Sequence, residues 1–362
     1  MNMSWIKSER TKEILIIAAM SIGLLLLIDG FLGYSILKHV PIDSRNSAER
    51  GIRIKHPVYH HTLAASYDGY ARGQSEYRFC TNPDGLKSKC GDSGDNKTYD
   101  IGFLGDSFTE GLGLPYEQTF VGLIAEQMPE KKIANLGVMS YSPTIYYLRL
   151  IDFLDKGYTF KELVVYIDIS DIQDEANYAI VDGRVVDTIK NIQKQQMFPL
   201  LNFGLKGLRD RLRTIFFPDF RPEVEEPVYS RNFRRGAWTF DPGDEGYGKV
   251  GVKGAIDKSL VMMERLYELC QKRGIKVSVA VYPWPGQILY DVEESRQVKI
   301  WREFCAGKCA NFYNSFPTFF GLAKSSSKEA VISNYYFKDD MHFNEIGNKL
   351  IASDFIKGYK SR

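Results

Sequence analysis

The sequence predicts an α/β protein with a doubly wound parallel sheet of five strands, preceded by one transmembrane helix. Short apolar runs, such as residues 101–104, alternate along the chain with longer amphipathic segments. This alternation is typical of buried parallel strands joined by helices. Near the N-terminus, residues 14–37 are apolar, apart from Asp29 after the uncharged core 14–28, over a length that can span a bilayer.

The composition is that of an ordinary globular protein. The chain has 362 residues, of which 44% are hydrophobic and 25% charged, enough for one large domain and additional segments. Its formal net charge is +2, and no contiguous basic stripe with interleaved aromatic residues is present. We therefore expect no nucleic-acid partner.

The N-terminal third divides into segments of different character. We expect a cytoplasmic tail at 1–11, an uncleaved signal anchor at 12–37, and a stalk with a small extension at 38–97. A cleaved signal peptide is the rival interpretation, but no small-x-small cleavage site stands out after the apolar stretch. Lysine and arginine residues occur on both sides of this stretch, so charge gives no orientation. We place the main domain, 98–362, outside the cytoplasm, in the periplasm, with a single span in the cell membrane.

Five cysteines, Cys80, Cys90, Cys270, Cys305 and Cys309, leave at least one thiol unpaired. Cys80 and Cys90 bracket a turn-rich segment and could close a loop in an oxidising compartment, whereas Cys305 and Cys309 could pair or be free thiols. Their spacing lacks the doubled CxxC pattern or added histidines of a zinc site. We expect no metal and no cofactor.

The regular elements of the main domain follow from pattern and length. Strands are expected at 101–104, 132–136, 163–167 and 277–282, helices at 117–128, 143–154, 255–273, 292–305 and 344–357, and a further segment at 311–320. Residues 176–252 break the alternation and form an insertion with a possible basic amphipathic helix at 203–217. Asp168, Asp171 and Asp174 follow the third strand, where a helix N-terminus that favours acidic residues explains them better than a cation site.

Ser107 is the best candidate for a nucleophile. It follows the apolar run 101–104 and a Gly105-Asp106 turn, at the end of a strand where an α/β sheet opens into its crevice. An unassisted serine is a weak nucleophile and needs a base, usually histidine. His342 is the only histidine outside the N-terminal region, and Asp339 stands three residues ahead of it. A carboxylate in that position can hold the imidazole tautomer.

Three sequence blocks, GDSFTEG, NLGVMSYSP and DDMHFN, resemble blocks I, II and V of the SGNH (GDSL-like) hydrolase superfamily. The resemblance spans residues 98–358 and implies a flavodoxin-like three-layer α/β/α fold. It implies a catalytic triad of Ser107, His342 and Asp339. It also implies an oxyanion hole formed by the amides of Ser107 and Gly137 and by a block III asparagine side chain.

The chain departs from the family at block III, where Ser170 occupies the asparagine position in Asp168-Ile169-Ser170-Asp171. A serine hydroxyl donates one hydrogen bond but reaches less far than an amide, so either Ser170 replaces the asparagine as the third oxyanion donor, another donor moves in, or the reaction is slow. Membrane-bound members of this superfamily that move acyl groups onto extracellular polysaccharides, as in alginate acetylation, also depart from the standard blocks. Trp284 and Gln287 follow the strand 277–282 and either line the substrate pocket or form a rigid structural turn.

The sequence thus predicts a membrane-anchored serine acyl-ester enzyme that is a carbohydrate O-acetyl esterase or O-acetyltransferase acting on cell-envelope glycans. Its partners would be an acylated glycan or another small ester, and the membrane. The alternative is a catalytically weakened SGNH domain that binds glycan or docks on a membrane acyltransferase, with Ser170 marking the loss of activity.

Overall fold

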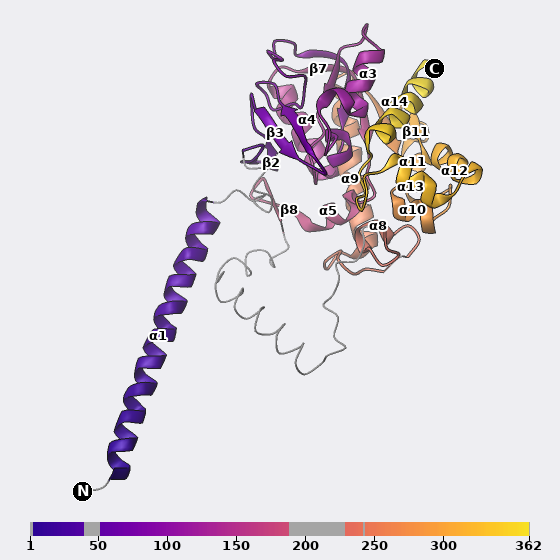
Figure 1. The fold of residues 1–362 in the computed structure, drawn as a ribbon. Coiled ribbons are helices and arrows are strands. Elements are labelled where there is room, and N and C mark those ends of the chain that lie inside the picture. The colour runs from indigo at the N-terminus through magenta and orange to yellow at the C-terminus, as the bar shows by residue number, and fades with distance from the viewer. Residues whose placement is uncertain (1–2, 40–50, 188–228, 242, 362) are drawn as a thin grey trace. The chain divides into compact units, whose positions relative to one another are not determined.

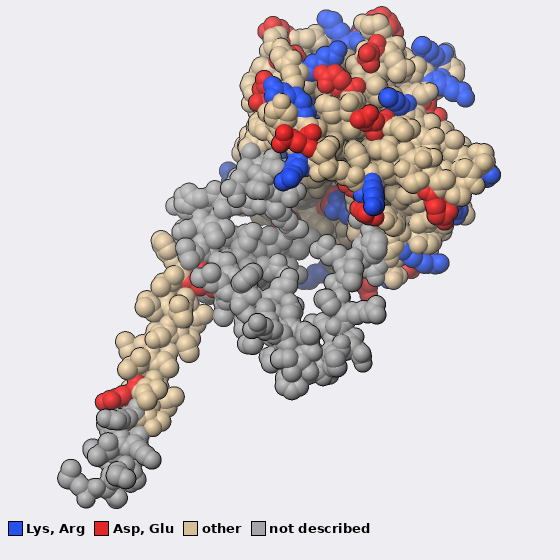
Figure 2. Space-filling model, viewed as in Figure 1, with Lys and Arg blue, Asp and Glu red and all other residues tan. Residues whose placement is uncertain are grey.

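The computed structural model describes residues 3–39, 51–187, 229–241 and 243–361, which fall into two units. The described part of the first unit is helix α1 (Met3–His39), which contains the apolar stretch Thr11–Phe31 with a mean hydropathy of 2.5. Figure 2 shows almost no charged side chains along this stretch. Its length and composition suit a membrane span, although a signal sequence has the same properties. The amphipathic helix predicted at 203–217 lies outside the described residues.

A parallel sheet of five strands forms the centre of the second unit (Figure 1). The strands are β5 (Thr98–Leu104), β6 (Ile133–Asn135), β7 (Thr159–Tyr166), β10 (Lys276–Val281) and β11 (Phe312–Asn314), in the spatial order β11-β10-β7-β5-β6. All neighbouring pairs are parallel, which confirms the predicted fold class. The strand order reverses between β5 and β7, and ligands of such sheets bind beyond the carboxyl ends of the strands at this point.

Helices flank the sheet in two packed groups. Helix α3 (Phe120–Gln127) packs on α14 (Glu345–Lys360), while α4 (Pro143–Asp155) and α5 (Asp171–Asn177) pack on α9 (Gly251–Lys272). The other helices after the insertion are α8 (Arg234–Ala237), α10 (Pro285–Tyr290), α11 (Arg296–Cys305), α12 (Phe316–Ser325) and α13 (Lys328–Tyr335).

Capping residues explain where the helices differ from their predicted bounds. The helix predicted at 117–128 begins at Phe120, because Thr119 accepts a hydrogen bond from the Gly122 N–H, and Tyr116–Gln118 form a separate 3₁₀ turn, η2. The helix predicted at 292–305 begins only at Arg296, where Ser295 is the N-cap. Residues 311–320 divide into β11 and the start of α12.

Two antiparallel hairpins precede the sheet. They consist of β1 (Arg53–His56) with β2 (His60–Leu63) and β3 (Asp68–Arg72) with β4 (Glu76–Cys80), and a third hairpin, β8 (Tyr178–Val181) with β9 (Arg184–Asp187), opens the insertion. We call residues 51–97 the N-terminal extension.

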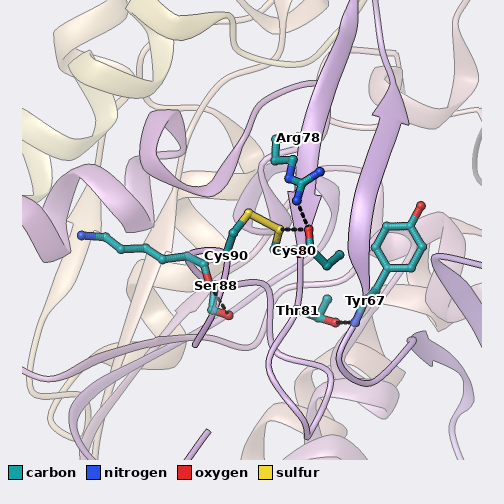
Figure 3. Close-up of a disulfide and its surroundings, with 8 residues drawn as sticks. Tyr67, Arg78, Cys80, Thr81, Ser88 and Cys90 are labelled. Atoms are coloured by element: carbon teal, nitrogen blue, oxygen red, sulfur yellow. Dashed lines mark hydrogen bonds and ion pairs between the residues drawn. A yellow bond between two sulfur atoms is a disulfide. The ribbon is translucent and has the colours of Figure 1, made fainter. Parts of the chain in front are cut away.

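Both cysteine pairs considered in the sequence are disulfide-bonded. Cys80–Cys90 ties the end of β4 to the loop that contains Ser88 (Figure 3), and Cys305–Cys309 closes a turn after α11. Cys270 is a free, buried thiol.

Candidate active site

Ser107 lies at the first turn after β5. The strand is apolar and buried at its carboxyl end, and Asp106 caps the short helix α2 (Ser107–Glu110) by accepting a hydrogen bond from the Phe108 N–H at 3.0 Å. The Ser107 N–H has no intrahelical partner and makes no hydrogen bond within the described part of the chain. The serine thus lies at the start of a capped helical turn, and its backbone N–H is available as a donor.

Two glycines allow close packing around α2, Gly105 just before the helix and Gly137 in the loop after β6. A Cβ atom on Gly105 would lie 2.0 Å from Thr109 Oγ1, and one on Gly137 would lie 2.5 Å from the Glu110 nitrogen. Asn135 joins the two segments, because its Oδ1 accepts from the Gly137 N–H at 2.9 Å and its Nδ2 donates to the Thr109 carbonyl at 2.8 Å. The Asn135 side chain and the close approach at Gly137 thus hold α2 and the loop after β6 together.

A chain of hydrogen bonds joins Ser107, His342 and a carboxylate. The distance from Ser107 Oγ to His342 Nε2 is 2.8 Å, and that from His342 Nδ1 to Asp340 Oδ1 is 2.7 Å. The prediction that Asp339 orients His342 is therefore wrong, and Asp340 takes this position. Asp339 has a left-handed backbone (φ 57°), and its Oδ1 accepts from the Tyr229 hydroxyl at 2.7 Å instead.

The imidazole of His342 is held in one orientation. Asp340 Oδ1 also accepts from the His342 backbone N–H at 3.1 Å, and the Phe108 ring packs 4.8 Å from the imidazole. Burial opposes ionisation of Asp340, but the hydrogen bonds from His342 outweigh it and lower the pKa of the carboxyl. An ionised Asp340 fixes the proton on Nδ1 and leaves Nε2 as an acceptor facing Ser107.

The three predicted oxyanion donors differ in availability. The Ser107 amide is free, whereas the Gly137 amide already donates to Asn135. Ser170 precedes α5, is 1% exposed, and donates its backbone N–H to Asp168 Oδ1 at 2.8 Å. Use of Gly137 or Ser170 by an oxyanion remains a prediction.

Trp284 and Gln287 do not line an open pocket. Gln287 is fully buried, its Oε1 accepts from the Trp284 N–H at 3.0 Å, and its Nε2 donates to Gln297 Oε1 at 3.1 Å. Trp284 is 3% exposed and donates its indole N–H to Asp168 Oδ2 at 2.6 Å. Of the two interpretations of this segment, the structure favours the structural turn over substrate contact, because Gln287 completes the capping of α10 and the Trp284 indole donates to Asp168.

Buried carboxylates gather around Asp106, the residue that precedes the serine. Asp106, Asp168 and Asp171 are buried, and one oxygen of each lies within 4.8 Å of one oxygen of the others. Asp171 and Asp174 belong to the first turn of α5, as expected, but both are also buried rather than solvated. Arg235 supplies positive charge by donating to Asp174 Oδ2 at 2.5 Å.

The N-terminal extension contributes buried charges that the sequence did not reveal. Arg53 forms an ion pair with Glu110 at 2.5 Å, and Glu110 Oε2 accepts from the Met139 N–H at 2.8 Å. Lys87 Nζ donates to the carbonyls of Gly111 at 2.8 Å and Leu114 at 2.6 Å, just after α2. No local pattern marks these residues, because each partner lies more than twenty positions away.

No protein-family model matches the sequence, and a search of curated proteins finds no match. The fold is similar to solved structures of low sequence identity. A member of the lipolytic protein G-D-S-L family from Veillonella parvula is 13% identical, with 71% of this chain and 96% of that chain covered and a TM-score of 0.37. The psychrotrophic esterase EstA from a Pseudoalteromonas species is 14% identical (74% and 98% covered, TM-score 0.38). The acetylxylan esterase Axe2 from Geobacillus stearothermophilus is 10% identical (72% and 93% covered, TM-score 0.40).

Proposed function

We propose that this protein is a serine acyl-ester enzyme of the SGNH type that removes or transfers short acyl groups, such as acetyl, on cell-envelope glycans. The observation that carries the proposal is the continuous chain of hydrogen bonds from Ser107 through His342 to Asp340. It supplies the nucleophile, base and orienting carboxylate that acyl transfer requires. The order of the three sequence blocks supports the same assignment.

The reaction follows from this geometry. His342 Nε2 takes the Ser107 proton as Oγ attacks the ester carbonyl carbon, and Asp340 stabilises the imidazolium that forms. The free Ser107 amide faces the developing oxyanion, assisted by Gly137 and Ser170 once the Gly137 amide leaves Asn135. Collapse of the tetrahedral intermediate releases the alcohol with the proton from His342. Water or a sugar hydroxyl then attacks the acyl-enzyme, which gives hydrolysis or transfer.

The cellular setting belongs to the same proposal. The stretch Thr11–Phe31 would anchor the chain in the cell membrane, and two disulfides favour an oxidising compartment for the domain that bears Ser107. An anchored domain on the outer side of the membrane meets envelope polysaccharides. A membrane acyltransferase is a candidate acyl-donor partner for such a domain. A purely binding or docking role is less well supported, because the hydrogen-bond chain at Ser107 is complete.

The test is incubation of the full chain in detergent with an acetyl donor and envelope glycans, with free acetate and acetylated sugar followed by mass spectrometry. Ser107→Ala is the inactive variant, and Ser93→Ala, at an exposed serine, is the matched control. Acetate alone indicates an esterase, and acetylated sugar indicates a transferase. If wild type and Ser107→Ala give the same products, the proposal is wrong.

A further inference from the structure

The Ser107 hydroxyl faces two acceptor atoms but carries one proton. Its Oγ lies 2.8 Å from His342 Nε2 and 3.2 Å from Asp106 Oδ2. In a neutral imidazole whose Nδ1–H donates to Asp340, Nε2 carries no proton and must accept the proton of the serine. The contact between Oγ and Asp106 Oδ2 then joins two oxygens with no proton between them. An ionised Asp106 would either repel Oγ or draw the serine proton away from the base.

The surroundings of Asp106 disfavour its charge. Asp106 is 1% exposed, and Asp168 and Asp171 each place an oxygen within 4.8 Å of one of its oxygens. Three negative charges in such a volume repel one another strongly, which favours protonation of part of the cluster. The charged and titratable groups around Asp106 are Asp168 after β7, Asp171 and Asp174 on α5, Tyr146 on α4, Arg235 on α8 and Tyr282 after β10.

Hydrogen bonding indicates where the charge and the proton lie. Both oxygens of Asp168 accept from N–H donors, Oδ1 from the Ser170 N–H and Oδ2 from the Trp284 indole N–H. Asp106 Oδ1 accepts from the Phe108 N–H and, at 3.4 Å, from the Tyr282 hydroxyl. Asp106 Oδ2 has no nitrogen donor in the described part of the chain. Burial and the neighbouring Asp168 accordingly raise the pKa of Asp106 well above its ordinary value.

We propose that Asp106 is a neutral carboxylic acid whose Oδ2–H donates a hydrogen bond to Ser107 Oγ and thereby directs the serine proton to His342. This inference rests on the proposed function and assigns a further residue to the same site. Asp106 keeps its proton throughout the reaction, so the serine proton still passes to His342 and on to the leaving alcohol. In the acyl-enzyme the same donor contacts Oγ as the ester oxygen that departs during deacylation.

Two variants of the full chain test this assignment. Asp106→Ala removes the donor and is expected to lower kcat by about 100-fold, the scale of one lost hydrogen-bond donor at a reacting oxygen. Asp106→Asn can still donate through Nδ2 and accept the Phe108 N–H through Oδ1, so it is expected to recover at least about 10-fold of that loss. If Asn is no better than Ala at equal thermal stability, the side chain acts as a carboxylate and the proposal is overturned.

Infrared difference spectra give a readout that needs no activity and no Ala variant. Wild type minus Asp106→Asn at neutral pH is expected to show the carbonyl stretch of one neutral carboxyl, whereas wild type minus Asp95→Asn, at an exposed carboxylate, shows none. Absence of the band overturns the proposal. So does loss of activity with a chelator and its recovery with Ca²⁺ or Mg²⁺, because a cation would then neutralise the cluster. A wild type that shows the band but no turnover contradicts the proposed function and leaves the protonation of Asp106 confirmed.

Discussion

Asp340 Oδ1 accepts two hydrogen bonds from one residue, the backbone N–H of His342 at 3.1 Å and its Nδ1–H at 2.7 Å. Two residues of separation allow a carboxylate to meet both donors in one tight turn. Asp339, one position earlier, is directed instead to Tyr229. The identity of the orienting carboxylate is thus decided by the backbone of the loop.

Replacing each of the two aspartates separately by asparagine tests this assignment. Asp340→Asn is expected to lower kcat by about 10²–10⁴-fold, because an amide cannot hold the Nδ1–H tautomer as a carboxylate does. Asp339→Asn is expected to stay within about 3-fold of wild type, as for a surface change. Steady-state hydrolysis of a short acyl ester measures both. A larger loss at Asp339 would contradict the assignment.

The buried ion pair between Arg53 and Glu110 is expected to matter for folding. Arg53→Met leaves the Glu110 charge buried without a cation, which should lower the free energy of unfolding by about 3–5 kcal/mol. The added change Glu110→Gln removes that charge while its side-chain oxygen still accepts from Met139, so the double variant should regain stability. Urea unfolding measures these differences.

Arg78→Met is the matched control for this pair, because Arg78 and Asp68 form an ion pair whose side chains are 41% and 57% exposed. We expect it to change the free energy of unfolding by less than about 1 kcal/mol. Equal effects of Arg53→Met and Arg78→Met would show that burial of the first pair is unimportant.

His61 is expected to make the fold sensitive to acid. Burial and then the neighbouring His60 lower its pKa from 6.5 to about 3, and its Nε2 contacts the Met139 carbonyl at 2.7 Å. Below pH 6.5, His61 binds a proton in the unfolded chain but stays neutral in the folded chain. The contribution of His61 to the free energy of unfolding is therefore fully present above pH 6.5 and is lost as the pH falls toward about 3. His61→Gln, which has no such titration, should lose less stability between about pH 7 and about pH 5. If the free energy of unfolding falls equally steeply with pH in wild type and in His61→Gln, His61 is not the cause of the acid sensitivity.

The Cys80–Cys90 disulfide supports the loop that carries Lys87 to the end of α2. Replacing both cysteines with serine is expected to cost about 3 kcal/mol of unfolding free energy and to lower kcat, because Lys87 holds the carbonyls of Gly111 and Leu114.

The Cys305–Cys309 pair is the control, because it closes a shorter loop of separation 4 after α11. Its replacement should cost about 2 kcal/mol and leave kcat unchanged. Equal loss of activity in both double variants would contradict a specific role of the first disulfide.

Local sequence patterns predicted many of the strands and helices. The apolar run at residues 101–104 predicted β5 and the position of Ser107, because a buried parallel strand needs no polar alternation. The spacing of Cys80 and Cys90 indicated a loop that a disulfide can close. Helix starts were less well predicted where a cap such as Thr119 or Ser295 lay inside the apparent pattern.

Contacts between segments far apart in the chain could not be predicted from local sequence patterns. Arg53 and Glu110 are 57 positions apart, and neither carries a local signal of burial. Gln287 looked suited to a substrate hydroxyl, but the tertiary fold buries it among its own helix and Gln297. The choice of Asp340 over Asp339 depends on backbone torsions that adjacent aspartates do not encode.

Intact-mass analysis after treatment with a serine-directed phosphonate tests the central claim most directly, that Ser107 is activated by His342 and Asp340. Wild type is expected to gain one adduct, mapped to Ser107, and Ser107→Ala none, while His342→Ala should label far more slowly although its serine is intact. Labelling of wild type no faster than that of Ser107→Ala would contradict the account.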